Sequence, residues 1–343
     1  MVIPVSHVKV NNKIFISIAS YRDPLLKFTI NEAYENAKHK DNIIFGVVEQ
    51  NDIEDSLNLD DFPFKDQIRY VRVDPGQSRG CCWARSLVQS LYLDEKYYFQ
   101  IDSHTAFDYK WDEIFIFALE ELRRYHIKPI ISQYPWGLEF DENGKAIKNF
   151  VKERNKIPFI APPPIDEPTW TMGESLHIIA RGYSYNSNQP FSHGFMLSAG
   201  CLFTLGDFIE EIPYDPRIFF QGEETTLALR AWTNGWNIFH MTSVPILHLY
   251  TDHEKRTRRL FWDQTEEDAR TFSYSEINNE SSKRIDLILS GVTHDAYGLG
   301  SKRTLDQFKQ FTGIDYLNKI YTERKNLHVH DYTKSPEDYM RKQ

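Results

Sequence analysis

An aspartate and a histidine lie two residues apart at the end of an apolar run in this chain. The run Tyr97-Tyr98-Phe99 leads into Gln100-Ile101-Asp102-Ser103-His104 and has the composition of a buried strand. In an open α/β sheet, ligands bind beyond the carboxyl ends of the strands. There Asp102 and His104 would offer one hard oxygen and one nitrogen to a divalent cation, a pair that suits Mn²⁺ or Mg²⁺ better than structural zinc. The alternative is that Asp102 and Ser103 only begin the helix that follows.

Two arginines flank a second motif, Gly80-Cys81-Cys82-Trp83-Ala84, where a helix is expected to begin beside the carboxyl edge of the sheet. Guanidinium groups and helix N-termini both favour phosphate. Arg79 and Arg85 are therefore candidate phosphate contacts. The alternative is that one of them pairs with Asp74 or another surface acid.

The elements that must position these residues alternate between strand and helix over the first 130 or so residues. Expected strands span 14–19, 43–48, 68–73, 97–101 and 129–132, and expected helices span 25–37, 84–93 and 111–125. This alternation predicts an α/β fold with a mostly parallel sheet flanked by helices. The pattern then breaks over residues 134–189, which carry Pro162-Pro163-Pro164, glycines and little periodicity. We expect an irregular substrate-side loop or lid there.

Regular patterns return in the second half of the chain. Residues 194–203 form a regular segment, 223–233 have helical spacing, and 236–248 supply one or two strands. Charged stretches at 256–270 and 276–289 have helical character and indicate a C-terminal helical extension. We therefore predict a main α/β domain over residues 1–265 and the extension over residues 266–343.

Composition excludes several classes of protein. Of the 343 residues, 41% are hydrophobic and 26% are charged, as in an ordinary folded domain. The formal net charge of −9 argues against a general nucleic-acid binder. No apolar run is long enough to cross a bilayer, and residues 1–12 lack a signal-peptide core, so we expect a cytoplasmic protein without an integral membrane segment. The three cysteines lack zinc-site spacing and are expected to be reduced, buried thiols.

Taken together, the motifs resemble those of nucleotide-sugar glycosyltransferases with the GT-A (Rossmann-like) fold. More narrowly, the chain resembles the retaining N-acetylglucosaminyltransferases that add α-GlcNAc to a hydroxyproline of a cytoplasmic ubiquitin-ligase subunit. The resemblance covers roughly residues 14–265 and lies in five stretches: Ile16 to Asp23, Phe45 to Gln50, Gly80 to Arg85, Gln100 to His104, and Gln221 to Glu224. The Asp-Ser-His and Gly-Glu arrangement is also similar to that of the polypeptide N-acetylgalactosaminyltransferases.

The resemblance implies a UDP-sugar donor, UDP-GlcNAc in the first place, and Mn²⁺ or Mg²⁺ as cofactor. It implies a third metal ligand beside Asp102 and His104, a histidine from a late strand. His248 is favoured because it ends an apolar run, and His240 and His253 are the alternatives. The implied partners are the nucleotide-sugar donor and a hydroxyl-bearing protein or glycan acceptor. Retention at the anomeric carbon is implied in the same way.

Donor contacts are expected from the end of the first strand, because the loop there lies against the nucleotide base in this fold. The backbone of Ala19 and the ring of Tyr21 could frame uracil, and Arg22 could approach the diphosphate. The resemblance adds Arg79, Arg85, Asp102 and Ser103 to the donor site. The alternative for this loop is a capped helix start, with Asp23 beside Pro24.

Glu223 and Glu224 follow Gly222 at the start of an expected helix. The resemblance implies that one of them touches the transferred sugar or the acceptor, and we list both as catalytic candidates. Carboxylates also favour a helix N-terminus through the helix dipole, so a capping role is the alternative. No clear nucleophile–base pair stands out in the motifs.

Other functions remain compatible with the sequence. A glycosyltransferase of surface polysaccharide synthesis could use another UDP-hexose with the same residues. A metal-dependent nucleotidyltransferase or sugar-phosphate hydrolase could use the same Asp/His pair and give a different product. A non-catalytic glycan-binding module is the alternative from another class, although Asp102, His104 and Glu223 argue against it.

Overall fold

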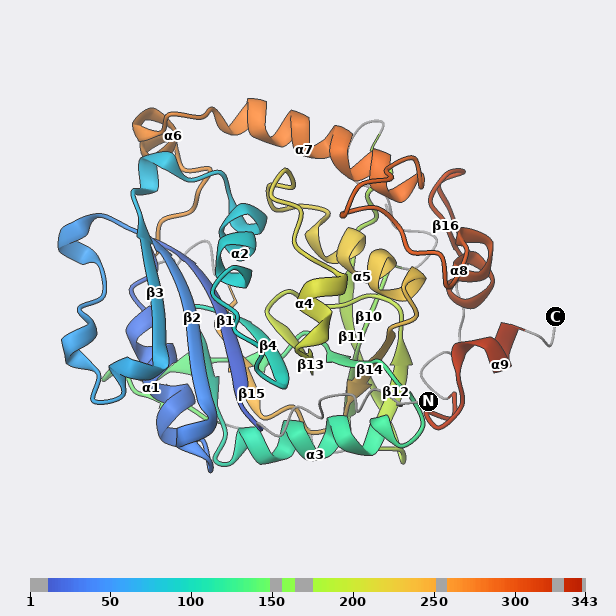
Figure 1. Ribbon diagram of the computed structural model, residues 1–343, viewed down its shortest axis with the longest axis horizontal. Helices are drawn as coiled ribbons and strands as arrows, with labels where there is room; N and C mark the ends of the chain where they lie inside the picture. The colour runs from blue at the N-terminus through green and yellow to red at the C-terminus, as the bar shows by residue number, and fades with distance from the viewer. Residues whose placement is uncertain (1–11, 149–155, 164–174, 251–257, 323–329, 341–343) are drawn as a thin grey trace, which may run out of the picture.

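A computed structural model describes residues 12–148, 156–163, 175–250, 258–322 and 330–340. Its centre is an eight-stranded sheet in the order β12-β14-β6-β13-β4-β1-β2-β3 (Figure 1). The strands are β1 (Ile14–Tyr21), β2 (Ile43–Gln50), β3 (Ile68–Val73), β4 (Tyr97–Asp102), β6 (Pro129–Ser132), β12 (Phe191–Gly194), β13 (Cys201–Leu205) and β14 (Asn237–Met241). Four of its seven neighbouring pairs are parallel and three are antiparallel. The predicted α/β class with a mostly parallel sheet is confirmed.

Apolar side chains alternate between the two faces of the central strands. In β1, Phe15 packs in one core and its neighbours Ile14 and Ile16 pack in the other, as the two-residue period of a strand requires. Helices α1 (Leu26–Asn36) and α3 (Trp111–Arg123) cover the face of Ile14. Helices α2 (Cys81–Gln89), α4 (Asp207–Glu211) and α5 (Glu223–Thr233) cover the opposite face (Figure 1).

Most predicted elements of the first half lie where the sequence placed them, and one helix differs. The helix expected over 84–93 spans Cys81–Gln89 instead. It begins earlier because the amide groups of Cys81 and Cys82 both donate to the carbonyl of Phe219, 3.0 and 3.4 Å away. This contact lies more than 130 residues away along the chain, and no local pattern announces it.

The prediction of an irregular segment over 134–189 is wrong for part of its length. Strands β10 (Lys156–Ala161) and β11 (Arg181–Asn186) form an antiparallel pair. Ile157, Phe159 and Ile160 are buried, and the last two join the core that also contains the apolar residues of α5. Burial against distant elements thus outweighs the weak local strand signal. The short strands β7 (Trp136–Gly137), β8 (Glu139–Phe140) and β9 (Ala146–Ile147) also lie in this segment.

A small sheet next to the central one brings a late strand to the end of β4. Strand β15 (Ile246–His248) lies between β5 (Thr105–Phe107) and β7. The antiparallel register of β15 and β5 places His248 opposite Thr105. His248 therefore lies beside the Asp102-Ser103-His104 turn, although 144 residues separate the two histidines.

The C-terminal part contains helices and one small pair of strands. These are α6 (Gln264–Ala269), α7 (Tyr274–Leu289), α8 (Leu305–Thr312), β16 (Ile314–Asp315), β17 (Ile320–Tyr321) and α9 (Pro336–Met340). The helix expected over 256–270 is shorter, since only Gln264–Ala269 is helical among the described residues there. A boundary at residue 265 falls inside α6, and the division into two domains stays a prediction. No helix in the described ranges has the length and apolar character needed to span a membrane.

Candidate active site

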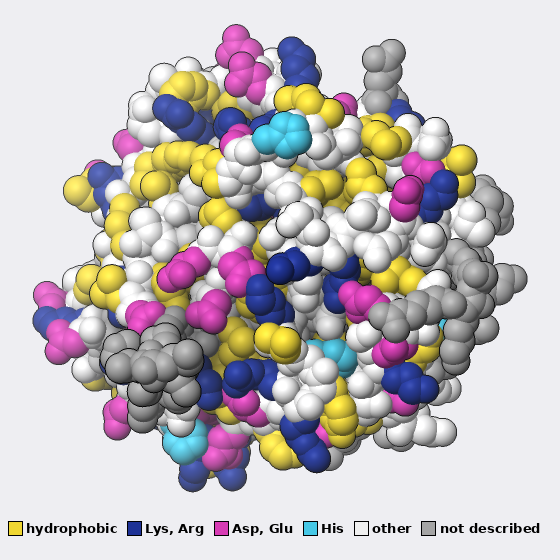
Figure 2. Space-filling view, turned by 45° about the vertical axis from the view of Figure 1, so that its right-hand side comes forward, with side chains coloured by type: hydrophobic (Ala, Val, Ile, Leu, Met, Phe, Trp, Pro, Cys, Tyr) yellow, Lys and Arg dark blue, Asp and Glu magenta, His cyan; other side chains and the backbone are white. Residues whose placement is uncertain are grey.

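Two neighbouring cavities open beyond the carboxyl ends of β1 and β4. The β1-side cavity, about 430 Å³, is lined by residues that include Ala19, Tyr21 and Ser103. The α5-side cavity, about 380 Å³, is lined by residues that include Tyr134, Glu223 and Glu224. Both share the side chains of Cys81, Asp102, Phe220, His248 and Tyr250. On the face drawn in Figure 2, acidic and basic side chains lie intermixed near the middle, so no single sign of charge dominates that face.

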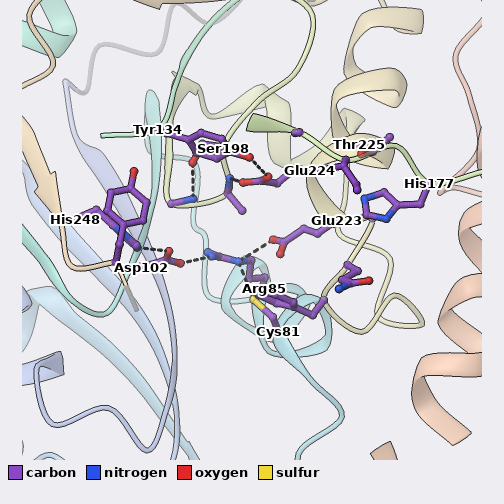
Figure 3. A pocket seen from close by; sticks show the side chains of 18 of the residues that line it. Cys81, Arg85, Asp102, Tyr134, His177, Ser198, Glu223, Glu224, Thr225 and His248 are labelled. Atoms are coloured by element: carbon purple, nitrogen blue, oxygen red, sulfur yellow. Dashed lines mark hydrogen bonds and ion pairs between the residues drawn. The ribbon is translucent and has the colours of Figure 1, made fainter. Parts of the chain in front are cut away.

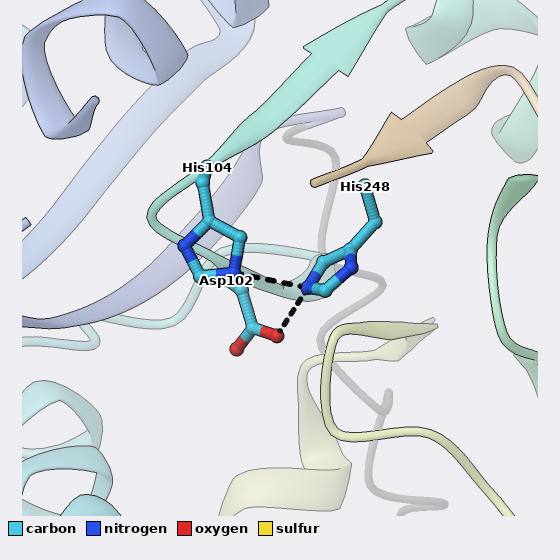
Figure 4. A group of neighbouring side chains, drawn as sticks. All are labelled: Asp102, His104 and His248. Carbon is cyan, nitrogen blue, oxygen red and sulfur yellow. Dashed lines mark hydrogen bonds and ion pairs between the residues drawn. The ribbon is translucent and has the colours of Figure 1, made fainter. Parts of the chain in front are cut away.

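Asp102, His104 and His248 converge at the boundary between the two cavities (Figure 4), where Asp102 and His248 line both and His104 lines the β1-side cavity. Their ligand atoms all lie within 4.8 Å of one another. His248 Nε2 is 2.9 Å from Asp102 Oδ2 and 3.1 Å from His104 Nε2. One carboxylate oxygen and two imidazole nitrogens thus face one point from two separate strand ends. This donor set fits a divalent cation.

Asp23 orients the first histidine of the cluster. Its Oδ2 accepts from Nδ1 of His104 at 2.6 Å and from the Ser103 hydroxyl at 2.8 Å. Burial works to raise the pKa of Asp23, but the bonds from His104, Leu25 and Ser103 hold it below the usual value. A carboxylate on Nδ1 fixes the ring so that Nε2 is the nitrogen that carries the lone pair. The imidazole is therefore prepared to act as a ligand through Nε2.

The charges around the cluster also fit a cation. Burial opposes ionisation of Asp102, yet His248 and Arg85 hold its pKa well below the usual range, so the carboxylate is charged. Burial lowers the pKa of His248, which keeps its imidazole neutral and able to ligate. The guanidinium of Arg258 lies 2.6 and 2.7 Å from the two ring nitrogens of His104. A metal ion bound through Nε2 of His104 would therefore have to displace this guanidinium.

Arg85 is a buried side chain that bridges Asp102 and Glu223. Its side chain is 1% exposed, with Nη2 2.7 Å from Asp102 Oδ1 and Nε 2.9 Å from Glu223 Oε1 (Figure 3). The guanidinium is therefore shared between a carboxylate of the cluster and one of the two adjacent glutamates. Arg85 lines the α5-side cavity, and its contacts hold the wall between the cavities together.

The adjacent glutamates have different surroundings (Figure 3). Glu223 Oε1 accepts from Arg85 and from the Tyr214 hydroxyl, 2.7 Å away. Glu224 accepts from the Ala199 amide and from the Tyr134 hydroxyl, both at 2.8 Å. Burial raises the pKa of Glu224 to about 7, and burial also raises that of Glu223 against the pull of Arg85. Glu223 is thus paired with Arg85, which also holds Asp102. The carboxyl group of Glu224, in contrast, changes its protonation near neutral pH.

The remaining predicted donor contacts divide into two groups. Ala19, Tyr21 and Ser103 line the β1-side cavity, although the Tyr21 hydroxyl donates to Glu266 at 2.7 Å. Arg22 pairs with Asp52 and with Glu266, and Arg79 is exposed with its guanidinium 4.4 Å from the centre of the Phe272 ring. Arg22 and Arg79 are not among the described residues that line either cavity.

The alternative third ligands lie elsewhere or outside the description. His240 is buried in the core, where its Nδ1 contacts the Ser132 carbonyl and Phe159 packs on its ring. It is not part of the cluster found among the described residues. His253 lies outside the described residues.

Four residues of the site escape analysis of the sequence: Asp23 as an orienting group, Tyr134, Tyr214 and Arg258. Asp23 carried a signal, since it directly follows Tyr21 and Arg22 in a matched motif. Tyr134 begins the segment without clear periodicity, Arg258 lies in a charged stretch that was expected only to be helical, and Tyr214 precedes α5 by nine residues. Only the fold brings Tyr134 and Arg258 to the cavities and the Tyr214 hydroxyl to Glu223.

Gly200 leaves no room for a side chain beside the cluster. A Cβ atom at this position would lie 2.8 Å from Asp102 Oδ2 and 3.6 Å from His248 Cδ2. We expect Gly200→Ala to displace the carboxylate and to weaken Mn²⁺ binding about 10- to 100-fold, as measured by calorimetric titration. Gly137→Ala is the matched control, because its Cβ would meet no atom within 4 Å although Gly137 pairs with His248. Unchanged Mn²⁺ affinity in a folded Gly200→Ala protein would contradict the assignment.

Solved structures show which fold this is. A crystal structure of GalNAc-T7 with UDP, GalNAc and Mn²⁺ matches with a TM-score of 0.55 and 11% sequence identity, over 88% of this chain and 56% of that chain. The present chain thus spans little more than half of that relative's length. The likeness confirms the predicted GT-A fold. The fragment 1–349 of S. aureus TarS matches with a TM-score of 0.43 and 12% identity, over 69% of this chain and 60% of that chain.

Sequence comparison assigns the family. No curated protein matches the chain significantly. The family model described as Glycosyltransferase (GlcNAc) matches residues 13–63 and 57–318. The matched ranges include both strand ends that carry the Asp102, His104 and His248 cluster, and α5 with Glu223 and Glu224. The chain therefore belongs to the Glycosyltransferase (GlcNAc) family and is a transferase.

Proposed function

We propose that this glycosyltransferase moves N-acetylglucosamine from UDP-GlcNAc to a hydroxyl group of a protein or glycan, with Mn²⁺ or Mg²⁺ held by Asp102, His104 and His248. The observation that carries the proposal is the position of this cluster at the boundary between two cavities, both of which Asp102 and His248 line. In this arrangement the β1-side cavity takes the nucleoside and the α5-side cavity takes the sugar and the acceptor hydroxyl.

Several observations support the choice of donor. The family model is named for GlcNAc transfer, and a relative with the same fold holds UDP, GalNAc and Mn²⁺. A bound cation supplies positive charge that stabilises the diphosphate as it leaves the sugar. Ala19 and Tyr21, which line the β1-side cavity, are suited to frame the uracil.

We propose retention of configuration without a covalent sugar–enzyme intermediate. Glu223 is held by Arg85 and Tyr214, and both oxygens of Glu224 accept hydrogen bonds. Neither carboxylate is placed as an unencumbered nucleophile. In the proposed step the bond between the anomeric carbon and the diphosphate oxygen breaks, and the acceptor oxygen bonds to the same face. The acceptor proton passes to the leaving phosphate oxygen. Mass spectrometry that traps a glycosylated Glu223 or Glu224 would contradict this route.

We propose a protein hydroxyl as the acceptor, on the basis of the resemblance to the hydroxyproline-linked enzymes. A glycan hydroxyl as the acceptor is the second case. A peptide containing hydroxyproline and a panel of saccharides, each incubated with the donor, separate the two by the product that gains the sugar.

A screen of UDP-sugars with Mn²⁺ tests the proposal without knowledge of the acceptor. Slow hydrolysis by water releases UDP, and we expect the largest release from UDP-GlcNAc, with loss of the signal in EDTA. UDP-GalNAc, UDP-glucose and UDP-galactose serve as matched donors. Release of UMP and sugar phosphate in place of UDP would indicate a nucleotidyltransferase or hydrolase, and nucleotide-independent sugar binding would indicate a glycan-binding module.

A further inference from the structure

Tyr134 contacts the glutamate that faces the α5-side cavity. It follows β6, lines the cavity and donates its hydroxyl to Glu224 Oε2 at 2.8 Å (Figure 3). The other oxygen, Oε1, accepts from the amide of Ala199 at 2.8 Å. Both protein partners of Glu224 are therefore donors, one on each oxygen. A carboxylate accepts from such partners in its ionised form, and it keeps lone pairs for a further donor.

The chain holds Tyr134 on both sides. The preceding residue, Gln133, exchanges two hydrogen bonds with the backbone of Met241, at 2.7 and 2.8 Å. The carbonyl of the following residue, Pro135, accepts from the Tyr250 hydroxyl at 2.6 Å. The tyrosine is thus fixed from the strand and from the cavity wall. Its hydroxyl reaches Glu224 from a rigid base, which is the arrangement that a positioning group requires.

The second donor is also fixed. The carbonyl of Ala199 accepts from the side-chain amide of Gln100, whose Nε2 is 2.7 Å away. The same Gln100 Nε2 also donates to the Tyr214 hydroxyl oxygen at 2.7 Å. Ala199 is therefore tied to β4, the strand that ends in Asp102. Glu224, which belongs to α5, is held between two donors that lie next to strands of the sheet, Tyr134 after β6 and Ala199 before β13.

We propose that Tyr134 is a positioning residue of the transferase, which together with the Ala199 amide holds Glu224 as an ionised acceptor for a substrate hydroxyl in the α5-side cavity. The inference rests on the proposed function, because that function places the sugar and the acceptor hydroxyl in this cavity. Tyr134 acts through Glu224 and takes no part in bond making.

The pH response of Glu224 makes the proposal measurable. Burial raises its pKa to about 7, and the bonds from Ala199 and Tyr134 oppose that rise. Loss of the Tyr134 hydroxyl therefore moves the pKa upward, and activity that needs the carboxylate falls at a higher pH. The titratable and charged groups around this site are Glu223 on α5, Cys81 and Arg85 on α2, Asp102 at the end of β4, His177 before β11, His248 at the end of β15 and Tyr250 after it.

The test compares Tyr134→Phe with the wild type in the pH profile of kcat/KM for UDP release. We expect the midpoint of the acid limb, near pH 7 in the wild type, to move upward by about one pH unit, since a hydrogen bond to a charged group has about that effect. At a pH well above both midpoints, the variant should regain most of the wild-type rate. A merely structural loss would lower the rate equally at every pH.

Tyr97→Phe is the matched control, because the Tyr97 hydroxyl also donates to a glutamate, Glu120, at 2.7 Å, outside both cavities. Its profile should coincide with that of the wild type. Gly182→Ala is a second variant: its Cβ would press on the Tyr134 ring from 3.1 Å, and the midpoint should move in the same direction.

A titration of ¹³C-labelled glutamate side chains by NMR gives a readout that needs no turnover, with the Glu224 signal assigned from Glu224→Gln. A Glu224 midpoint that is the same in folded Tyr134→Phe and in the wild type overturns the inference. Failure of the wild type to release UDP from any UDP-sugar would instead overturn the proposed function, and the NMR titration would still decide the role of Tyr134.

Discussion

Asp102→Asn is expected to lower Mn²⁺-dependent UDP release by about two to three orders of magnitude. The substitution removes the charged oxygen that lies 2.9 Å from His248 Nε2 and leaves two imidazoles to hold the cation. The amide still offers an oxygen to Arg85, whose Nη2 is 2.7 Å from Oδ1 of the aspartate. The buried guanidinium therefore keeps an acceptor, and the fold should persist.

Initial rates of UDP release over a series of Mn²⁺ concentrations measure this effect. Circular dichroism checks that the variant is folded. Asp108→Asn is the control, because Asp108 follows the same turn and contacts the amide of its neighbour Tyr109. It should behave as the wild type does. Wild-type rates in Asp102→Asn, or rates that EDTA does not reduce, would refute the metal assignment.

Substitution by glutamine should mainly lower the stability of the protein at Glu223 and mainly lower its activity at Glu224. Glu223→Gln removes one of the two carboxylates that neutralise Arg85, a side chain that is 1% exposed. We expect a loss of about 3 kcal/mol in the free energy of unfolding, since breaking a buried ion pair leaves a charge without its full partner. Glu224→Gln leaves the Arg85 pairs in place and should change stability by less than about 1 kcal/mol.

When only the folded fraction of each variant is counted, Glu224→Gln should lose more activity than Glu223→Gln. Glu224→Gln removes the charged acceptor in the α5-side cavity, and we expect kcat to fall about 100-fold. Urea denaturation gives the stability of each variant, and kcat measured at a temperature where both are folded gives the second comparison. Equal stability losses in the two variants would show that the glutamates share one structural role.

The sequence predicts the central sheet well because the strands are short apolar runs bounded by polar turns. Residues 97–101 and 43–48 carry short apolar runs that are typical of a buried strand, and the structure confirms both strands. Asp102 and His104 follow as candidate metal ligands from the same logic, since a polar residue directly after such a run lies at the edge of the sheet, whereas a third ligand from a late strand was implied by the family resemblance. His248 ends the buried run Ile246–His248, and the structure brings it to Asp102 and His104.

The partners of charged side chains could not be predicted in this way. Arg85 was expected to meet phosphate, and the structure surrounds it with Asp102 and Glu223. Arg22 lies between Asp52 and Glu266, and the latter is 244 residues away in the sequence. An arginine near the end of a strand has a local signal, but the acid that pairs with it is chosen by long-range packing.

The antiparallel pair β10 and β11 was missed for a related reason. Pro158 interrupts the first strand and Gly182 the second, and both residues reduce the local strand preference. Ile160 nevertheless is fully buried against the core. The gain from burying apolar side chains is a property of the whole fold, so no pattern within the segment reports it.

Diffraction from a crystal soaked with UDP and MnCl₂ tests the central claim most directly. With X-rays of an energy above the manganese absorption edge, the account predicts an anomalous peak in contact with Asp102, His104 and His248. The diphosphate of UDP should lie beside this peak, and the uridine should lie in the β1-side cavity. Clear density for UDP with no manganese at these three side chains would contradict it.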